Sequence, residues 1–175
     1  MLDDVLQSHL LELPAELRNT IYRYVLLCDD QVRINEENWQ APPLLRTCKQ
    51  TREEASPIYY QENRCRLCTL GFNTDAVTSW YQHAAQHRQR MQRLSMYITT
   101  GVRSRADLVT WARRFHSDYV PFVSAGTTKE SWLLRVILMF RSVEVLRDVP
   151  WKTVEKVVQN DISAILVGSS FRFDQ

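Results

Sequence analysis

Hydrophobic residues recur at helical spacing near the start of the chain. Four of them follow one another at intervals of four residues: Leu13, Leu17, Ile21 and Val25. This period predicts an amphipathic helix. Pro14 suits its first turn, because the N–H that proline lacks would have no partner there in any case. The pattern therefore predicts a helix from about residue 14 to residue 27.

A second apolar pattern follows Pro42 and Pro43, which favour the start of another helix. Its members share one predicted helix face: Leu44, Leu45, Cys48, Arg52 and Ala55. Pro57 is expected to break or kink this helix, because proline removes a hydrogen bond and disfavours a helical residue before it. A short helical piece is predicted directly after Pro57.

Alternating and apolar runs predict strands at residues 31–35, 64–70 and 93–99. A helix is predicted at 74–92, so the last two strands form a strand–helix–strand unit and are expected to be parallel neighbours. Ser104 is predicted to cap the next helix. Two further helices are expected from residue 129 and from Pro150. The sequence thus predicts one α+β domain over 1–175, with an N-terminal helix pair, a small strand–helix–strand layer and C-terminal helices.

Composition limits the class of protein. The chain has 175 residues, of which 45% are hydrophobic, and a formal net charge of +2. It contains no run of eighteen apolar residues, so no membrane span is expected. Acidic residues near the start argue against a secretory signal. We therefore expect an intracellular protein of the cytoplasm or nucleus, with its four cysteines reduced.

A cysteine and histidine pattern raises the question of zinc. Cys65 and Cys68 are separated by two residues and His83 and His87 by three, with fourteen residues between the pairs. That spacing is typical of a two-Cys, two-His zinc site. In an extended strand, however, positions 65 and 68 point to opposite faces. Buried thiols are therefore favoured, and His83 and His87 are expected on one helix face. A zinc-dependent module remains the alternative.

No motif for catalysis stands out. The chain has no G-x-S-x-G, G-x-G-x-x-G, phosphate-binding P-loop or H-E-x-x-H pattern. We expect no catalytic residues, no cofactor and no enzymatic activity.

Two blocks near the N-terminus carry a family resemblance. They read LPAELRNTIY, from Leu13, and LLRTCKQTREEA, from Leu44, and Tyr60-x-x-Asn63 follows them. Together they resemble the F-box-like domains of filamentous fungi, over about residues 11–67, with 68–175 as an α/β and helical body. The resemblance implies a protein–protein interaction adaptor, as in the substrate receptors of cullin–RING ubiquitin ligases.

By position, the resemblance implies one docking element at Leu13, Pro14, Leu17 and Ile21 and a second at Leu44, Leu45 and Cys48. The implied partner is the Skp-type linker protein of the ligase, and the rest of the chain would hold a protein substrate. An amphipathic helix pair also suits such docking on physical grounds.

A second interpretation of the apolar positions in these two helices stays open. Leu17, Ile21, Val25, Leu45, Cys48 and Ala55 are alternatively core residues that pack the two helices together. Glu16 and Arg52 are candidates for an ion pair between these helices.

Charge suggests a different function. Residues 81–115 hold seven basic residues and one acidic residue, whereas residues 1–62 hold six basic and eleven acidic residues. A nucleic-acid-binding protein is the alternative that this asymmetry raises. It would use the Arg-rich 88–114 region: Arg88, Arg90, Arg93, Arg103, Arg105, Arg113 and Arg114.

Overall fold

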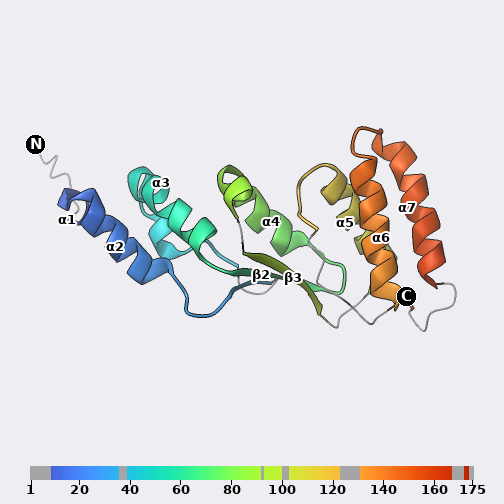
Figure 1. The fold of residues 1–175 in the computed structure, drawn as a ribbon, viewed down its shortest axis with the longest axis horizontal. Coiled ribbons are helices and arrows are strands. Elements are labelled where there is room, and N and C mark those ends of the chain that lie inside the picture. Colours follow the sequence, from blue (N-terminus) through green and yellow to red (C-terminus); the bar gives the residue numbers. More distant parts are fainter. Residues whose placement is uncertain are drawn as a thin grey trace, which may run out of the picture.

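The computed structural model describes residues 9–35, 39–91, 93–99, 103–122, 131–166 and 172–173. It has an α+β fold, as the sequence predicts. Helices of the N-terminal part lie at one end of a small sheet and those of the C-terminal part at the other end (Figure 1). None of the described helices is both long and apolar enough to cross a membrane.

The sheet has three parallel strands in the order β1-β2-β3. They are β1 (Val32–Ile34), β2 (Cys65–Leu70) and β3 (Leu94–Thr99). Cys65 lies between Val32 of β1 and Leu94 of β3 in the register. The predicted parallel pairing of the last two strands is confirmed. The structure adds β1 to the same sheet, so each strand is joined to the next by helical segments.

The first helix pair agrees with the prediction only in part. Helix α1 (His9–Glu12) precedes α2 (Ala15–Leu26), and α2 confirms the first predicted helix. The second predicted helix is wrong as one element. Residues Pro43–Arg46 form a short 3-10 turn, η1, and a separate helix, α3 (Lys49–Pro57), follows it. Cys48 interrupts the two because it has extended backbone angles and caps α3.

Pro57 does not break the chain of helical turns. Pro57 is the last residue of α3, and Ser56 before it is helical and buried. A π-helical segment, η2 (Ile58–Glu62), continues directly from it and includes the short helical piece that the sequence predicts. The α-helix thus ends at Pro57, where a break or kink is predicted, but the expectation that proline disfavours a helical Ser56 is wrong.

The helix after β2 is shorter than predicted. Helix α4 (Asp75–His83) has Ala84 as its C-cap, and a 3-10 segment, η3 (Ala85–Arg90), leads to β3. Helices α5 (Arg105–His116), α6 (Ser131–Val145) and α7 (Trp151–Leu166) pack together at the C-terminal end (Figure 1). The predicted cap of α5 is confirmed, because the Ser104 hydroxyl accepts a hydrogen bond from the Asp107 N–H at 3.2 Å.

One hydrophobic core runs through both ends of the fold. Its largest fully buried side chains come from α2, the β2–α4 turn, α4, α5 and α6: Tyr22, Phe72, Trp80, Trp111 and Phe140. Trp111 packs against Phe140 with ring centroids 4.8 Å apart. The core thus joins the sheet to the C-terminal helices, and α2 adds to it at the N-terminal end.

Candidate protein-interaction site

Helix α2 has two apolar faces, and only one of them is buried. Tyr22 and Leu26 enter the core. The other face carries four apolar side chains with exposed fractions of 37% to 91%: Leu17 52%, Ile21 37%, Tyr24 91% and Val25 57%. Their spacing places them along one side of the helix. We call these four residues the α2 stripe.

The α2 stripe contradicts the interpretation of the first helix as a pure core element. Leu17, Ile21 and Val25 are not core residues, because each exposes more than a third of its surface. Leu13 is half-buried and Pro14 is exposed directly before α2. The structure therefore leaves most of the first predicted docking element accessible.

The second predicted docking element is less accessible. Leu45 is buried and belongs to the core, and Leu44 is half-buried against it. Cys48 is half-buried, and its sulfur accepts a hydrogen bond from the N–H of Thr51 at 3.5 Å. Ala55 is fully buried, so for Leu45 and Ala55 the core reading is correct. Of the two predicted docking elements, the one on α2 therefore has more of the available apolar surface.

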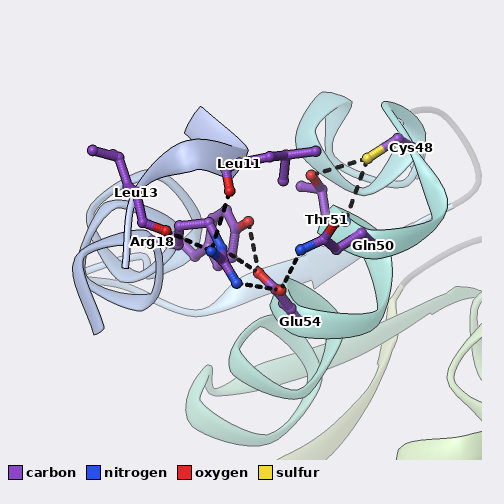
Figure 2. Close-up of polar contacts among 8 residues, drawn as sticks. Leu11, Leu13, Arg18, Cys48, Gln50, Thr51 and Glu54 are labelled. Carbon is purple, nitrogen blue, oxygen red and sulfur yellow. Dashed lines mark hydrogen bonds and ion pairs between the residues drawn. The ribbon is translucent and has the colours of Figure 1, made fainter. Parts of the chain in front are cut away.

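A polar junction, centred on Arg18 beside the α2 stripe, holds α2 against α3 (Figure 2). Arg18 donates two hydrogen bonds to the Glu54 carboxylate, from Nε to Oε2 at 2.8 Å and from Nη2 to Oε1 at 2.6 Å. The Tyr22 hydroxyl donates to Glu54 Oε2 at 3.0 Å, and Gln50 Nε2 donates to Oε1 at 3.0 Å. Four donated hydrogen bonds converge on one carboxylate, which strongly favours its charged form.

The charge of Glu54 is accordingly stabilised. The Arg18 hydrogen bonds, followed by that from Gln50, lower the pKa of Glu54 from 4.5 to about 2. Arg18 also donates from Nη1 to the carbonyl of Leu13 at 2.6 Å. One guanidinium group therefore fixes the Leu13–Pro14 turn and α3 to the same helix.

The expected ion pair between Glu16 and Arg52 is wrong. Both residues are exposed, and the ion pair between the helices joins Arg18 to Glu54 instead. Arg18 and Glu54 each lie two positions after the residues expected to pair, and therefore on a different face of each helix. The participants nevertheless belong to the two resembling blocks, which was the signal available in the sequence.

A buried asparagine joins the end of α2 to η2, and sequence reasoning did not assign it a role. Asn63 Nδ2 donates to the carbonyls of Leu26 at 2.9 Å and Tyr59 at 3.1 Å. Its Oδ1 accepts from the N–H of Cys28 at 2.9 Å. The only signal was its place in the Tyr60-x-x-Asn63 sequence. Asn63 satisfies backbone groups where α2 ends and thereby fixes the orientation of that helix.

The zinc pattern does not form a site. The burial of β2 alternates, with Cys65 buried and Cys68 half-exposed on the other face, as extended geometry predicts. His83 and His87 do not share a helix face, because α4 ends at His83. Instead, His87 stacks on Tyr60 with centroids 5.3 Å apart. Among the residues described, no three His, Cys, Asp or Glu side chains gather where they could hold a metal ion.

The Arg-rich 88–114 region is divided among several contacts. Arg88 pairs with Asp118 at 3.0 Å, and Arg114 pairs with Asp75 at 2.6 Å. Arg105 binds the side chain of Gln159 on α7. Arg88, Arg105 and Arg114 thus connect elements of the fold, and no described contact favours this region as a nucleic-acid surface.

Comparison with protein-family models, with curated proteins and with solved structures finds no match to this chain. The site is therefore interpreted from its own geometry.

Proposed function

We propose that this protein is a non-catalytic protein–protein interaction adaptor of the F-box-like type. In this proposal the α2 stripe docks in an apolar groove of the Skp-type linker protein of a cullin–RING ubiquitin ligase. The protein would then act as a substrate receptor. The observation that carries the proposal is the exposure of four apolar side chains on one side of α2, Leu17, Ile21, Tyr24 and Val25. The helix is held in place by the buried Tyr22 and Leu26 and by the Arg18–Glu54 ion pair.

The stripe has the features of a helix that binds in a groove. Single exposed apolar residues are ordinary on protein surfaces. Contiguous ones at positions i, i+4, i+7 and i+8 form a continuous apolar surface, which is the arrangement that helix-in-groove recognition uses. Tyr24, with 91% of its surface exposed, offers the largest side chain to a partner.

The polar junction supports the same proposal. Because Arg18, Tyr22 and Glu54 hold the inner face of α2, the helix can present its outer face without rearranging. A surface that is already ordered loses less conformational entropy on binding. The junction residues also come from the two blocks that carry the F-box-like resemblance.

A binding experiment with a matched control tests the proposal. Purified linker protein would be titrated with the wild-type chain, with Leu17→Asp/Ile21→Asp, and with Leu134→Asp/Leu138→Asp. The control leucines are about half exposed on α6, so the chemical change is closely similar at a distant surface. We expect wild type and control to bind, and the stripe variant to bind at least about tenfold more weakly.

Two outcomes would overturn the proposal. One is the absence of binding by folded wild-type protein at about 10 μM linker protein. The other is equal binding by the stripe variant and wild type. Thermal melts of all three proteins establish that each is folded. Loss of binding by the α6 control alone would assign the contact to a different surface.

A further inference from the structure

One face of the parallel sheet is covered and the other is open. Helix α4 packs on β1 and β2 and lies on one side of the sheet (Figure 1). On β2, Cys65, Leu67 and Thr69 are buried, whereas Arg66 and Cys68 are half-exposed and Leu70 is exposed. Alternate residues point to opposite faces, so the exposed set lies on the side away from α4. Parallel sheets are usually covered on both faces, which makes this open face unusual.

Arginines concentrate on the open face. The register places Arg33 of β1 directly beside Arg66 of β2, and Ser95 of β3 follows in the same row. Arg64 and Arg93 directly precede β2 and β3, and their carbonyls accept from Val32 and Cys65 at 2.8 and 2.9 Å. Arg64 lies two residues before Arg66 on one strand, and Arg93 lies two residues before Ser95 on the next. Both therefore lie on the same face of the sheet as Arg66. We call Arg33, Arg64, Arg66 and Arg93 the arginine face.

Nothing in the described structure neutralises this charge. Residues 31–35, 64–70 and 93–99 contain no Asp or Glu. Of the ion pairs within the described ranges, none uses an arginine of this face. Arg18, Arg23, Arg88 and Arg114, by contrast, each pair with a carboxylate. Like charges on neighbouring strands are destabilising, and an anionic partner would remove that cost.

The rest of the open face is apolar or neutral. Cys68 and Tyr97 are neighbours in the register, and Leu70 follows two residues along β2. Tyr97 and Leu70 are exposed. The face therefore has a cationic half, formed by the four arginines, and a half that offers apolar contact. A partner that fits this face needs negative charge at the end near the arginines and apolar groups at the end near Tyr97 and Leu70. The partner can therefore lie in only one direction along the strands.

We propose that the arginine face binds an acidic segment of a partner protein, with adjacent carboxylates between the four guanidinium groups. Guanidinium groups bind carboxylates through paired hydrogen bonds. Apolar residues beyond the carboxylates would lie against Tyr97 and Leu70. This surface is separate from the α2 stripe, so the inference does not depend on the proposed docking of a linker protein.

The geometry favours a protein segment over a nucleic acid. The four arginines form a compact group that occupies two adjacent rows of residues across the strands. A single-stranded nucleic acid instead needs cations spaced along its backbone and several aromatic rings on which its bases can stack. Tyr97 is the one exposed aromatic side chain that the described part of this face presents. Arginines that could extend a track, such as Arg88 and Arg114, are already paired.

Fluorescence anisotropy provides the test. The probe is a labelled peptide of about four glutamates followed by two leucines, at low ionic strength. The variants are Arg33→Glu/Arg66→Glu and the control Arg113→Glu/Arg141→Glu, which makes the same charge change at exposed positions of α5 and α6. We expect the peptide to bind wild type and control, with at least about tenfold weaker binding to the sheet variant. Added salt should weaken the wild-type complex.

Several results of this experiment would refute the proposal. Equal binding by all three proteins, or no binding to wild type at about 100 μM, would overturn it. A single-stranded oligothymidine that bound more tightly than the peptide, and was lost in Arg33→Glu/Arg66→Glu, would overturn it in favour of nucleic acid. Should that variant not fold, Arg64→Glu/Arg93→Glu replaces it, because both of these side chains are exposed before the strands.

Discussion

Arg18 and Glu54 lie 36 residues apart in the sequence and form a bidentate ion pair between α2 and α3. The pair fixes the face that α2 turns toward the rest of the protein. Its geometry leaves Leu17 and Ile21 on the outer side of the same helix. The proposed function therefore depends on a polar contact that α2 makes beside the stripe.

The Glu54 contact predicts a specific dependence of stability on pH. Because the folded state lowers the pKa of Glu54 from 4.5 to about 2, ionised Glu54 stabilises the fold fully above about pH 4.5. That contribution is lost as the pH falls toward 2. We expect Glu54→Gln to lower the melting temperature by several degrees at neutral pH. The difference from wild type should shrink between about pH 4.5 and 2, measured by thermal melts across that range.

Glu53→Gln is the matched control for this prediction. Glu53 is adjacent in sequence, but its pair with Lys49 is exposed and longer, at 3.8 Å. Exposed pairs of this kind contribute little. A Glu53→Gln variant should melt close to wild type. A constant difference between Glu54→Gln and wild type at every pH would contradict the assigned role of Glu54.

The two apolar faces of α2 predict opposite results for neighbouring residues. Leu26 is buried in the core and Val25 is 57% exposed. Leu26→Ala should lower the free energy of unfolding by about 2–5 kcal/mol, because it leaves a cavity. Val25→Ala should change it by less than about 0.5 kcal/mol. Urea denaturation measures both values, and an equally large loss at Val25 would mean that the α2 stripe is packed in solution.

Asn63 is expected to be among the most sensitive polar positions. Asn63→Ala removes hydrogen bonds to Leu26, Tyr59 and Cys28 and leaves buried backbone groups without partners. The free energy of unfolding should fall by about 2–4 kcal/mol. Asn63→Asp keeps the acceptor for Cys28 but replaces both donated hydrogen bonds with repulsion. The exposed Asn160 on α7 provides the control, and a similar loss for Asn160→Ala would refute a special role for Asn63.

The cysteines should differ in reactivity. Burial raises the pKa of Cys65 to about 11, so little thiolate forms at neutral pH. Cys28, by contrast, is exposed. Iodoacetamide at about pH 8 should modify Cys28 quickly and Cys65 only after denaturant is added, as followed by mass spectrometry of peptides. Equal rates at the two thiols in the folded protein would contradict the buried position of Cys65.

Patterns among residues close in the sequence were sufficient to predict much of the secondary structure. The four-residue apolar period predicted α2, and alternation predicted β2 with Cys65 and Cys68 on opposite faces. The Ser104 cap was predicted because a hydroxyl before an apolar helical run satisfies free N–H groups. These features depend on residues close in sequence, which is why the sequence predicts them.

Features that depend on distant partners were missed. One local feature was missed as well: the apolar spacing from Leu44 to Ala55 suggested one helix, although Cys48 has extended backbone angles and its sulfur caps α3 through the N–H of Thr51. The sequence likewise offered Glu16 and Arg52 as an ion pair, and it gave no role to Asn63. Helical spacing identifies residues on a common face but does not indicate which residue of another helix that face meets.

The sequence alone determined the order of helices and strands and the alternating faces of the central strand, because both follow from the backbone periods of helix and strand. Which side of α2 enters the core was decided only by the tertiary structure. Apolar residues occur on both sides of that helix, so hydrophobicity does not distinguish them. Arg18, Glu54 and Asn63 form their specific contacts only when Tyr22 and Leu26 face inward, and these directional contacts leave the α2 stripe in solvent.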